Sequence, residues 1–320
     1  MGSAYPPPPD DGPSTVSIHR QDFIDKDRLD TNGNARLVPV KFTFPLKPDR
    51  KLPIIVWSHG LGGSREGAGF LNRYLASHGY IVITVTHIGT DTSLWEGKPG
   101  HPWDNIRQAK ISRKDTLQRF KDIPFVLDSL EGWAAEYPET GKYMDLASIG
   151  MSGHSFGAAT TQVMAGQLLG RKGRHYSLKE ERFKAAIAYS PSVTYNHSED
   201  SDVIYKPISV PMLYMTGTND DSPVSGKGYD YRIDIFENAG GPDQYLMILE
   251  EGDHMVFAGS RGRLGVNPHR EKHEALIKHM ALTFWNAYLK DDNEAKSWLQ
   301  EKAKDFLTDE GSFKTRQLLK

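Results

Sequence analysis

One serine in this chain is flanked by glycines at the spacing that a nucleophilic serine requires. A short apolar run passes through Gly-x-Ser-x-Gly into a small-residue helical pattern, reading Ile149-Gly150-Met151-Ser152-Gly153-His154-Ser155-Phe156-Gly157-Ala158-Ala159-Thr160. This pattern predicts a sharp strand-to-helix turn that exposes the hydroxyl of Ser155 for acyl transfer. We expect glycine at 153 and 157 because a side chain there would collide with the neighbouring strand or helix.

Residues that could activate this serine follow it along the chain. A serine hydroxyl is a weak nucleophile until a base takes its proton. His254, in a loop after the last apolar strand, is the candidate base because imidazole titrates near neutrality. Asp220 and Asp221 are both candidates for the acid that orients this base, and the Gly-x-x-Asp spacing favours Asp220. Asp253 is interpreted as a turn former, because sequence neighbours rarely face each other productively.

Acyl transfer also requires two N–H groups that stabilise the developing negative charge. Phe156, directly after the nucleophile, supplies one by its position, and Leu61 in the glycine-rich loop 58–64 is the candidate for the other. His59 and His154 neighbour these residues, and we interpret them as scaffold or as pocket lining. No metal or organic cofactor is needed for this chemistry.

The elements that must position these residues alternate between strands and helices. Apolar runs predict strands at 37–44, 54–57, 81–85, 147–151, 185–189, 211–216 and 245–249. Helical patterns cover 70–77, 111–133 with an interruption near Pro124, 158–169 and 272–288, before a polar helical tail. This order, with nucleophile, acid and histidine in sequence, predicts an α/β-hydrolase fold with a mostly parallel sheet and helices on both faces. We expect one catalytic domain over 21–320 behind an extended, loosely packed Pro-rich segment over 1–20.

Composition excludes several classes of function. The chain has 320 residues, a net charge of −2, 38% hydrophobic residues and no cysteine. It therefore lacks disulfides, thiolate zinc sites and a cysteine nucleophile, and the charge does not favour nucleic acid as a partner. No apolar run is long enough for a membrane span. Residues 30–34 are read as a turn rather than a calcium loop, and His269 and His273 as a solvated helix face rather than a metal site.

Several sequence blocks together resemble one known family. They are residues 36–45, 58–63, 78–80, 87–91, 125–128, 153–157, 217–223 and 252–257. In this order they are similar to bacterial α/β-hydrolases grouped with dienelactone hydrolases and secreted platelet-activating factor acetylhydrolases. The resemblance implies Ser155 as nucleophile, His254 as base, and the Leu61 and Phe156 amides as oxyanion donors.

Two departures from that family limit what the resemblance carries over. In its animal phospholipase members the acid follows the strand after the nucleophile helix. This chain has Tyr189-Ser190-Pro191-Ser192 at that position, without a carboxylate, so the acid must be Asp220 or Asp221 as in the bacterial lipase-like members. Dienelactone hydrolases proper use a cysteine nucleophile, which this chain lacks. The resemblance therefore does not imply that this chain shares the phospholipid specificity of the animal members or the substrate of the dienelactone hydrolases.

We expect the loops that follow the strands to determine substrate specificity, and the expected substrate is a small-molecule ester. Trp95 and Trp103, in region 88–110, are candidates for an apolar wall that contacts the acyl or aromatic part of the substrate. The equally weighted alternative is that both tryptophans only fill the interior of an irregular loop. Without a long apolar lid helix, we expect a serine esterase for short- to medium-chain esters that works through an acyl-enzyme. The alternatives are a phospholipase A2-type or lipase-like hydrolase, an amidase or peptidase, and a non-catalytic binding module. The sequence does not determine the oligomeric state, and the Pro-rich start would suit a secreted or periplasmic protein.

Overall fold

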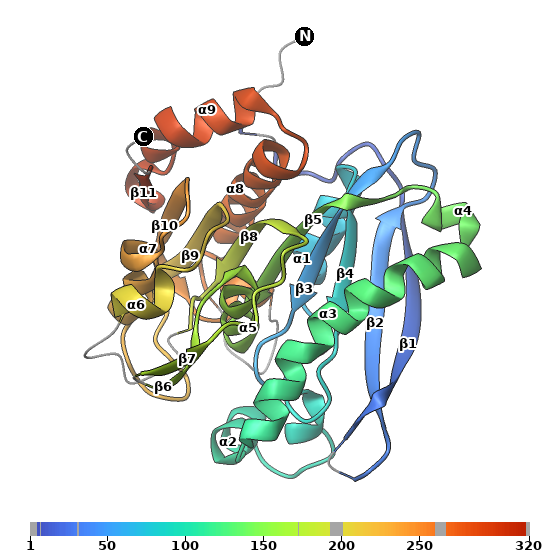
Figure 1. The fold of residues 1–320 in the computed structure, drawn as a ribbon. Coiled ribbons are helices and arrows are strands. Elements are labelled where there is room, and N and C mark those ends of the chain that lie inside the picture. Colours follow the sequence, from blue (N-terminus) through green and yellow to red (C-terminus); the bar gives the residue numbers. More distant parts are fainter. Residues whose placement is uncertain are drawn as a thin grey trace.

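A nine-stranded sheet runs through the molecule (Figure 1), which is a computed structural model that describes residues 5–6, 8–30, 32–171, 173–192, 201–259 and 267–317. Within these residues, the strand order is β1-β2-β4-β3-β5-β8-β9-β10-β11. Its strands are β1 (Val16–Leu29), β2 (Ala35–Pro45), β3 (Leu52–Ser58), β4 (Ile81–Val85), β5 (Met144–His154), β8 (Phe183–Tyr189), β9 (Met212–Asn219), β10 (Gln244–Asp253) and β11 (Gly311–Arg316). The six central strands from β4 to β10 pair in parallel, and β1, β2 and β11 pair antiparallel at the edges. This is the α/β-hydrolase architecture expected from the sequence.

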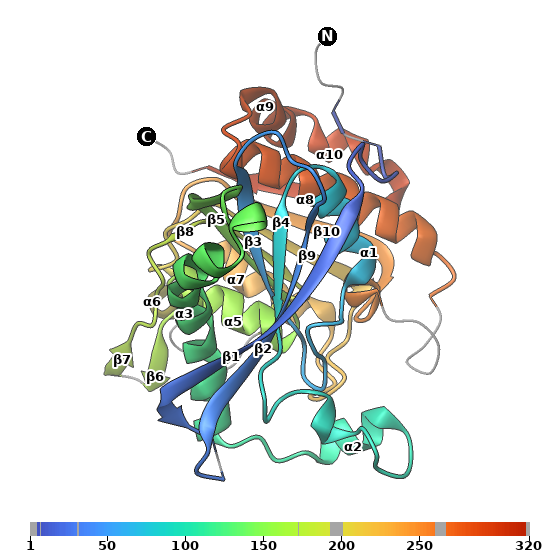
Figure 2. The same ribbon diagram turned by 90° about the vertical axis from the view of Figure 1, so that its right-hand side faces the viewer.

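Helices cover both faces of the sheet (Figures 1 and 2). They are α1 (Gly69–Ser77), α2 (Pro102–Gln108), α3 (Arg113–Glu136), α4 (Pro138–Gly141), α5 (Phe156–Ala165), α6 (Ser201–Tyr205), α7 (Asp234–Asn238), α8 (Arg270–Leu289), α9 (Asn293–Glu301) and α10 (Ala303–Phe306). One apolar core joins the sheet to α3, α5, α6 and α7, and a second joins it to α1, α8 and α9. The short α2 lies beyond the sheet, clear of both layers. A small hairpin of β6 (Leu169–Arg171) and β7 (Arg174–Tyr176) follows α5.

The parallel register brings the predicted site loops to one edge of the sheet. Ser58 pairs with Gly153 across β3 and β5, and Gly153 pairs with Ala188 across β5 and β8. Asn219 pairs with Asp253 across β9 and β10. Because parallel strands end at the same edge, the loops that follow β3, β5, β9 and β10 are neighbours in space.

Two helices differ from the sequence prediction. Helix α3 continues through Pro124 without the interruption that we expected there. Ser112 caps its N-terminus, with a hydroxyl that accepts a hydrogen bond from the Asp115 N–H, and the buried stripe of the helix packs on the sheet. Helix α5 ends at Ala165 rather than near 169, because Gly166 has φ 125° and turns the chain towards β6.

The ends of the chain carry structure that the sequence did not indicate. Strand β1 begins at Val16, inside the predicted Pro-rich segment, and β11 follows the helical tail at the opposite edge of the sheet. The described residues before β1 are also docked rather than loosely packed. Tyr74 donates a hydrogen bond to the Pro8 carbonyl, and Gly12 donates to the Ser77 hydroxyl. Residues 1–4 and 7 of that segment lie outside the described residues.

Candidate active site

Ser155 lies on the strained turn between β5 and α5. Its backbone has φ 56° and ψ −114°, an unusual conformation for a residue other than glycine, and its N–H donates to the Tyr189 carbonyl at 2.9 Å. A Cβ at Gly153 would lie 2.4 Å from the Gly157 oxygen, and a Cβ at Gly157 would lie 1.9 Å from the Ser58 oxygen. The expected collision at both glycines is therefore confirmed, and it involves backbone atoms that cannot move aside.

His254 and Asp220 are brought together by the ends of β10 and β9. The His254 Nδ1 lies 2.7 Å from Asp220 Oδ1, and both side chains are buried. The other carboxylate oxygen, Oδ2, accepts a hydrogen bond from the Thr216 hydroxyl at 2.8 Å. Asp221 is exposed. Of the two aspartates left open by the sequence, only Asp220 contacts the histidine.

A buried arginine that sequence reasoning missed joins this pair. Arg232, in the short 3₁₀ turn Tyr229–Ile233, lies 3.1 Å from Asp220 Oδ1 and 3.3 Å from His254 Nδ1. Its Nε also donates to the Asp220 carbonyl at 2.9 Å. No sequence motif indicated this residue, because it lies 12 positions after Asp220 in an irregular segment.

The backbone N–H groups of Leu61 and Phe156 belong to two segments next to Ser155, the loop after β3 and the start of α5. Phe156 is the first residue of α5, where the N–H has no partner within the helix. Within the described residues, neither the Leu61 N–H nor the Phe156 N–H donates to another protein group. A Cβ at Gly60 would lie 3.4 Å from the Ser155 Cβ, so glycine permits this close approach of the loop. Both groups are therefore available to a ligand at Ser155.

His154 and His59 are buried, and this burial favours their neutral form. His154 Nε2 donates to the His254 carbonyl at 2.7 Å, which anchors the loop that carries His254. His59 Nδ1 donates to the Gly60 carbonyl at 2.6 Å, and its Nε2 accepts from the His87 N–H at 3.0 Å. Burial lowers the pKa of His154 and the pKa of His59 well below the ordinary value. Both residues thus hold neighbouring loops in place, and both also line the pocket beside Ser155.

A buried polar network lies beneath the loop that carries Leu61. The Arg119 guanidinium donates to the Ser58 hydroxyl at 2.9 Å, to the His59 carbonyl, and to the Thr160 hydroxyl at 2.9 Å. It also lies 4.5 Å from the centre of the Phe156 ring. Arg119 thereby connects both candidate oxyanion donors to helix α3.

The network continues from Ser58 to a buried carboxylate. The Ser58 hydroxyl lies 3.0 Å from His87 Nε2, and His87 Nδ1 donates to Asp122 at 3.0 Å. Arg36 contacts both oxygens of Asp122, at 3.0 and 2.7 Å. These buried charges could have been recognised in the sequence. Arg36, Arg119 and Asp122 lie at positions that share the inward faces of β2 and α3 with apolar residues.

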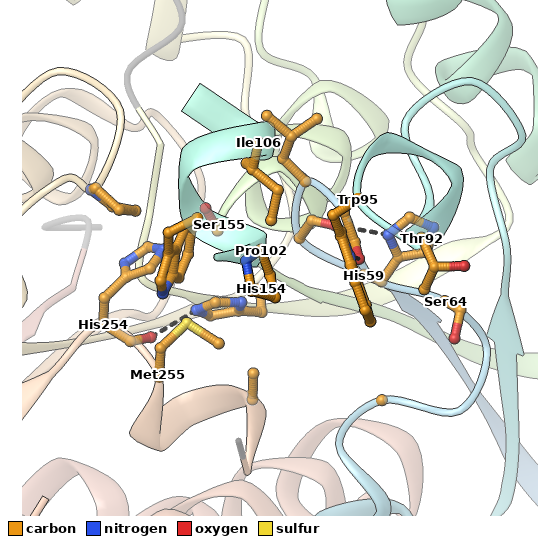
Figure 3. Close-up of a pocket in the computed structure, with 18 of the residues that line it drawn as sticks. His59, Ser64, Thr92, Trp95, Pro102, Ile106, His154, Ser155, His254 and Met255 are labelled. Atoms are coloured by element: carbon orange, nitrogen blue, oxygen red, sulfur yellow. Dashed lines mark hydrogen bonds between the residues drawn. The ribbon is translucent and has the colours of Figure 1, made fainter. Parts of the chain in front are cut away.

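A pocket of about 450 Å³ opens above Ser155 (Figure 3). Ser155, His254 and Met255 lie on one side of it, and Trp95, Thr92 and Ser64 on the other. Its described lining contains no Asp, Glu, Lys or Arg. The apolar part of the lining is formed by Trp57, Leu61, Ala68, Trp95, Pro102, Trp103, Ile106, Pro223, Val224, Met255 and Ala258. The pocket is thus a neutral, mostly apolar space.

Both candidate tryptophans contribute to the pocket wall, and each is tied to a neighbouring loop. Trp95 Nε1 donates to the Gly62 carbonyl at 2.7 Å, directly beside Leu61. Arg107 in α2 lies 5.9 Å from the Trp103 ring centre and donates to the Pro223 carbonyl at 3.0 Å. Trp95 therefore lines the pocket and also supports the loop that carries Leu61.

The weaker sequence candidates are structural in this geometry. The Asp30 carboxylate accepts hydrogen bonds from the N–H groups of Asn32 and Asn34, which makes a turn. His269 lies 2.8 Å from Glu251. The expected solvated helix face is wrong for His273, which is buried in α8 against the body of the protein. The described residues contain no cluster of three or more His, Cys, Asp or Glu side chains that could hold a metal ion. Nor does any helix among them combine the length and hydrophobicity that crossing a bilayer requires.

Comparison with known proteins identifies similar sequences. A family model described as "Platelet-activating factor acetylhydrolase, isoform II" matches residues 26–96, which include Leu61 and Trp95. The platelet-activating factor acetylhydrolase of Cavia porcellus is 25% identical over 189 residues, covering 48% of this chain and 38% of that protein. The one of Canis lupus familiaris is 26% identical over 209 residues, covering 55% and 42%. The matched region thus spans about two fifths of these curated relatives.

Proposed function

We propose that this chain, an α/β-hydrolase of the platelet-activating factor acetylhydrolase-like group, hydrolyses carboxylic esters through an acyl-enzyme on Ser155. The observation that carries the proposal is the position of Ser155. It lies on a strained elbow at the base of an apolar pocket that His254 also lines, and His254 is hydrogen-bonded to the buried Asp220. This arrangement supports nucleophilic catalysis by serine, with histidine as base and aspartate as its orienting acid.

In the first half of the proposed reaction, Ser155 Oγ attacks the ester carbonyl carbon while His254 Nε2 takes its proton. The carbonyl oxygen becomes an oxyanion, which the Leu61 and Phe156 N–H groups stabilise. The tetrahedral intermediate collapses, the alcohol leaves with the proton from His254, and the acyl group stays on Ser155. In the second half, water attacks the acyl-enzyme and gives its proton to His254. The carboxylic acid then leaves, and Ser155 recovers its proton.

The size and lining of the pocket favour neutral esters with short- to medium-length acyl chains as substrates. Its volume of about 450 Å³ and its apolar wall suit such groups, and no charged side chain in the described lining would pair with a charged substrate. Trp95 and Trp103 are proposed to contact the acyl or aromatic part of the ester, and His154 to line the pocket beside it.

Hydrolysis of p-nitrophenyl esters from acetyl to palmitoyl tests this proposal. We expect turnover that is highest for the short and medium chains. Ser155→Ala should lower it by roughly a millionfold, as for a serine protease nucleophile. Absence of turnover above background, or equal turnover by wild type and variant, would overturn the proposal.

The similarity to platelet-activating factor acetylhydrolases favours a second substrate, the acetyl ester of platelet-activating factor itself. A phospholipid carries a charged phosphate, for which the described lining offers no cationic side chain. We therefore expect a lower kcat/KM for platelet-activating factor than for p-nitrophenyl acetate. A higher kcat/KM for platelet-activating factor would instead favour the activity for which those relatives are named.

A further inference from the structure

Arg232 is a buried side chain that contacts both Asp220 and His254. It is 1% exposed, and its guanidinium reaches atoms of three segments of the chain. Two of these contacts are to the end of β8, where Nη1 donates to the carbonyls of Ser190 and Pro191 at 3.3 and 2.8 Å. The others are to Asp220 and His254, described above. Burying an arginine this fully is costly unless each of its donors has a partner.

The positions of the protons decide what Arg232 does to the histidine. His254 Nδ1 must carry a proton to donate to Asp220 Oδ1 at 2.7 Å. The Arg232 Nη2, which is also a donor, therefore bonds to Asp220 Oδ1 at 3.1 Å and only approaches His254 Nδ1 at 3.3 Å. Asp220 is shared between the histidine and a permanent cation.

We propose that Arg232 is a positioning residue that orients Asp220 and places a permanent positive charge beside the base His254. An aspartate next to a histidine favours the imidazolium form, whereas a cation at 3.3 Å disfavours it. Among the described residues, the titratable groups that face His254 are Asp220, Arg232 and the ring of His154, whose centre lies 4.7 Å away. Tyr231 covers the outer side of Arg232, with its ring centre 4.8 Å from the guanidinium carbon. Of these groups, only Arg232 brings a positive charge to the imidazole.

The same contacts explain how the acid comes from β9 instead of β8. The end of β8 carries Ser190, a buried residue with φ 51°, in place of a carboxylate. Arg232 binds its carbonyl and the Asp220 carbonyl together, so it holds the ends of β8 and β9 in a fixed relation. Removing the Arg232 side chain would therefore free the loop that carries Asp220 and would also remove the positive charge beside His254.

The test compares a neutral and a charged replacement, Arg232→Gln and Arg232→Lys, and it rests on the proposed ester hydrolysis. The measurement is kcat/KM for p-nitrophenyl butyrate as a function of pH. We expect Arg232→Gln to move the acid limb of the profile upward by about one pH unit or more. Arg232→Lys should keep the acid limb near that of wild type while lowering kcat, because lysine retains the charge but not the fork of donors. Arg232→Met is the second neutral variant if Arg232→Gln does not fold.

Arg182→Met is the matched control, because Arg182 pairs with Glu180 and Asp128 away from the pocket. It should leave the profile unchanged. If the neutral variants fold and lose activity with an unmoved acid limb, Arg232 is only structural and the electrostatic part of the inference is wrong. Equal shifts of the acid limb in the neutral variants and in Arg232→Lys would also show that the electrostatic part of the inference is wrong.

Histidine NMR titration in a Ser155→Ala background separates this inference from the proposed function. It follows protonation of His254 without any turnover. An upward movement of its titration midpoint in Arg232→Gln would support the inference even if the wild type hydrolysed no ester. An unmoved midpoint would overturn the inference even if ester hydrolysis were established.

Discussion

At the scale of single residues, the site depends on a few positions that allow no alternative. Gly157 faces the Ser58 carbonyl so closely that even a methyl group would overlap it. Ser155 keeps a positive φ because the strand before it and the helix after it are both fixed in the core. The geometry also separates two adjacent aspartates, of which one is buried against His254 and the other is exposed.

Substitution of these two aspartates tests the acid assignment. Asp220→Asn should lower kcat by about ten-thousandfold, because the amide cannot orient the imidazole in the required tautomer. Asp221→Asn should leave most of the activity. Both are measured as kcat for p-nitrophenyl butyrate, with thermal unfolding to check the fold. The reverse pattern would assign Asp221 as the acid, and no effect of either would contradict the triad.

At the scale of elements, the site is assembled where β3, β5 and α3 meet. The loop after β3 carries Leu61, and the helix after β5 begins with Phe156. Neither element alone fixes the distance between these two N–H groups. Arg119 does so from α3, since it bonds to the His59 carbonyl on one side and packs on the Phe156 ring on the other. The helix that covers the sheet thus also sets the geometry of the candidate oxyanion hole.

Removing this arginine should therefore affect the chemical step more than substrate binding. For Arg119→Met we expect kcat to fall by about ten- to hundredfold with little change in KM. This loss is smaller than that from deleting an oxyanion donor outright, because the N–H groups are displaced and not removed. Arg113→Met, at an exposed position of the same helix, is the control. A folded Arg119→Met enzyme with unchanged kcat would show that the loop holds its shape without the arginine.

At the scale of the whole molecule, three buried histidines connect stability to pH. Burial lowers the pKa of His59, the pKa of His87 and the pKa of His154 well below the ordinary value. The unfolded chain binds a proton at each of them below about pH 6.5, while the folded protein does not. The free energy of unfolding should therefore decrease as the pH falls below that point, by about 1.4 kcal/mol per pH unit for each histidine.

Urea unfolding between pH 7.5 and 5 measures this dependence. His154→Gln should reduce the slope below pH 6.5 by about 1.4 kcal/mol per pH unit, because glutamine does not titrate and its amide can still donate to the His254 carbonyl. His269→Gln, at a half-exposed position, is the surface control. An identical slope in wild type and His154→Gln would mean that His154 takes up its proton in the folded state.

Much of the fold and part of the site could be predicted from local sequence. The central strands are short apolar runs, and Ser155, Leu61, Phe156 and His254 stand at fixed offsets from strand ends, so their neighbourhood follows from a parallel sheet. The outer elements were missed for a physical reason. Strand β1 has an exposed face and an irregular register, and β11 is short, so neither carries a buried apolar run.

The sequence by itself determined the strand-to-helix turn at Ser155, the order of the candidate triad and the glycines that the close backbone contacts require. These features are local, because they depend on residues within one turn or one strand end. Only the tertiary structure showed that Asp220 contacts His254 while Asp221 is exposed, and it placed Arg232 and Arg119 beside the candidate site. Those choices depend on which side chains are buried against segments far away along the chain. The energy of a buried charge is set by its three-dimensional neighbours and not by its position in the sequence.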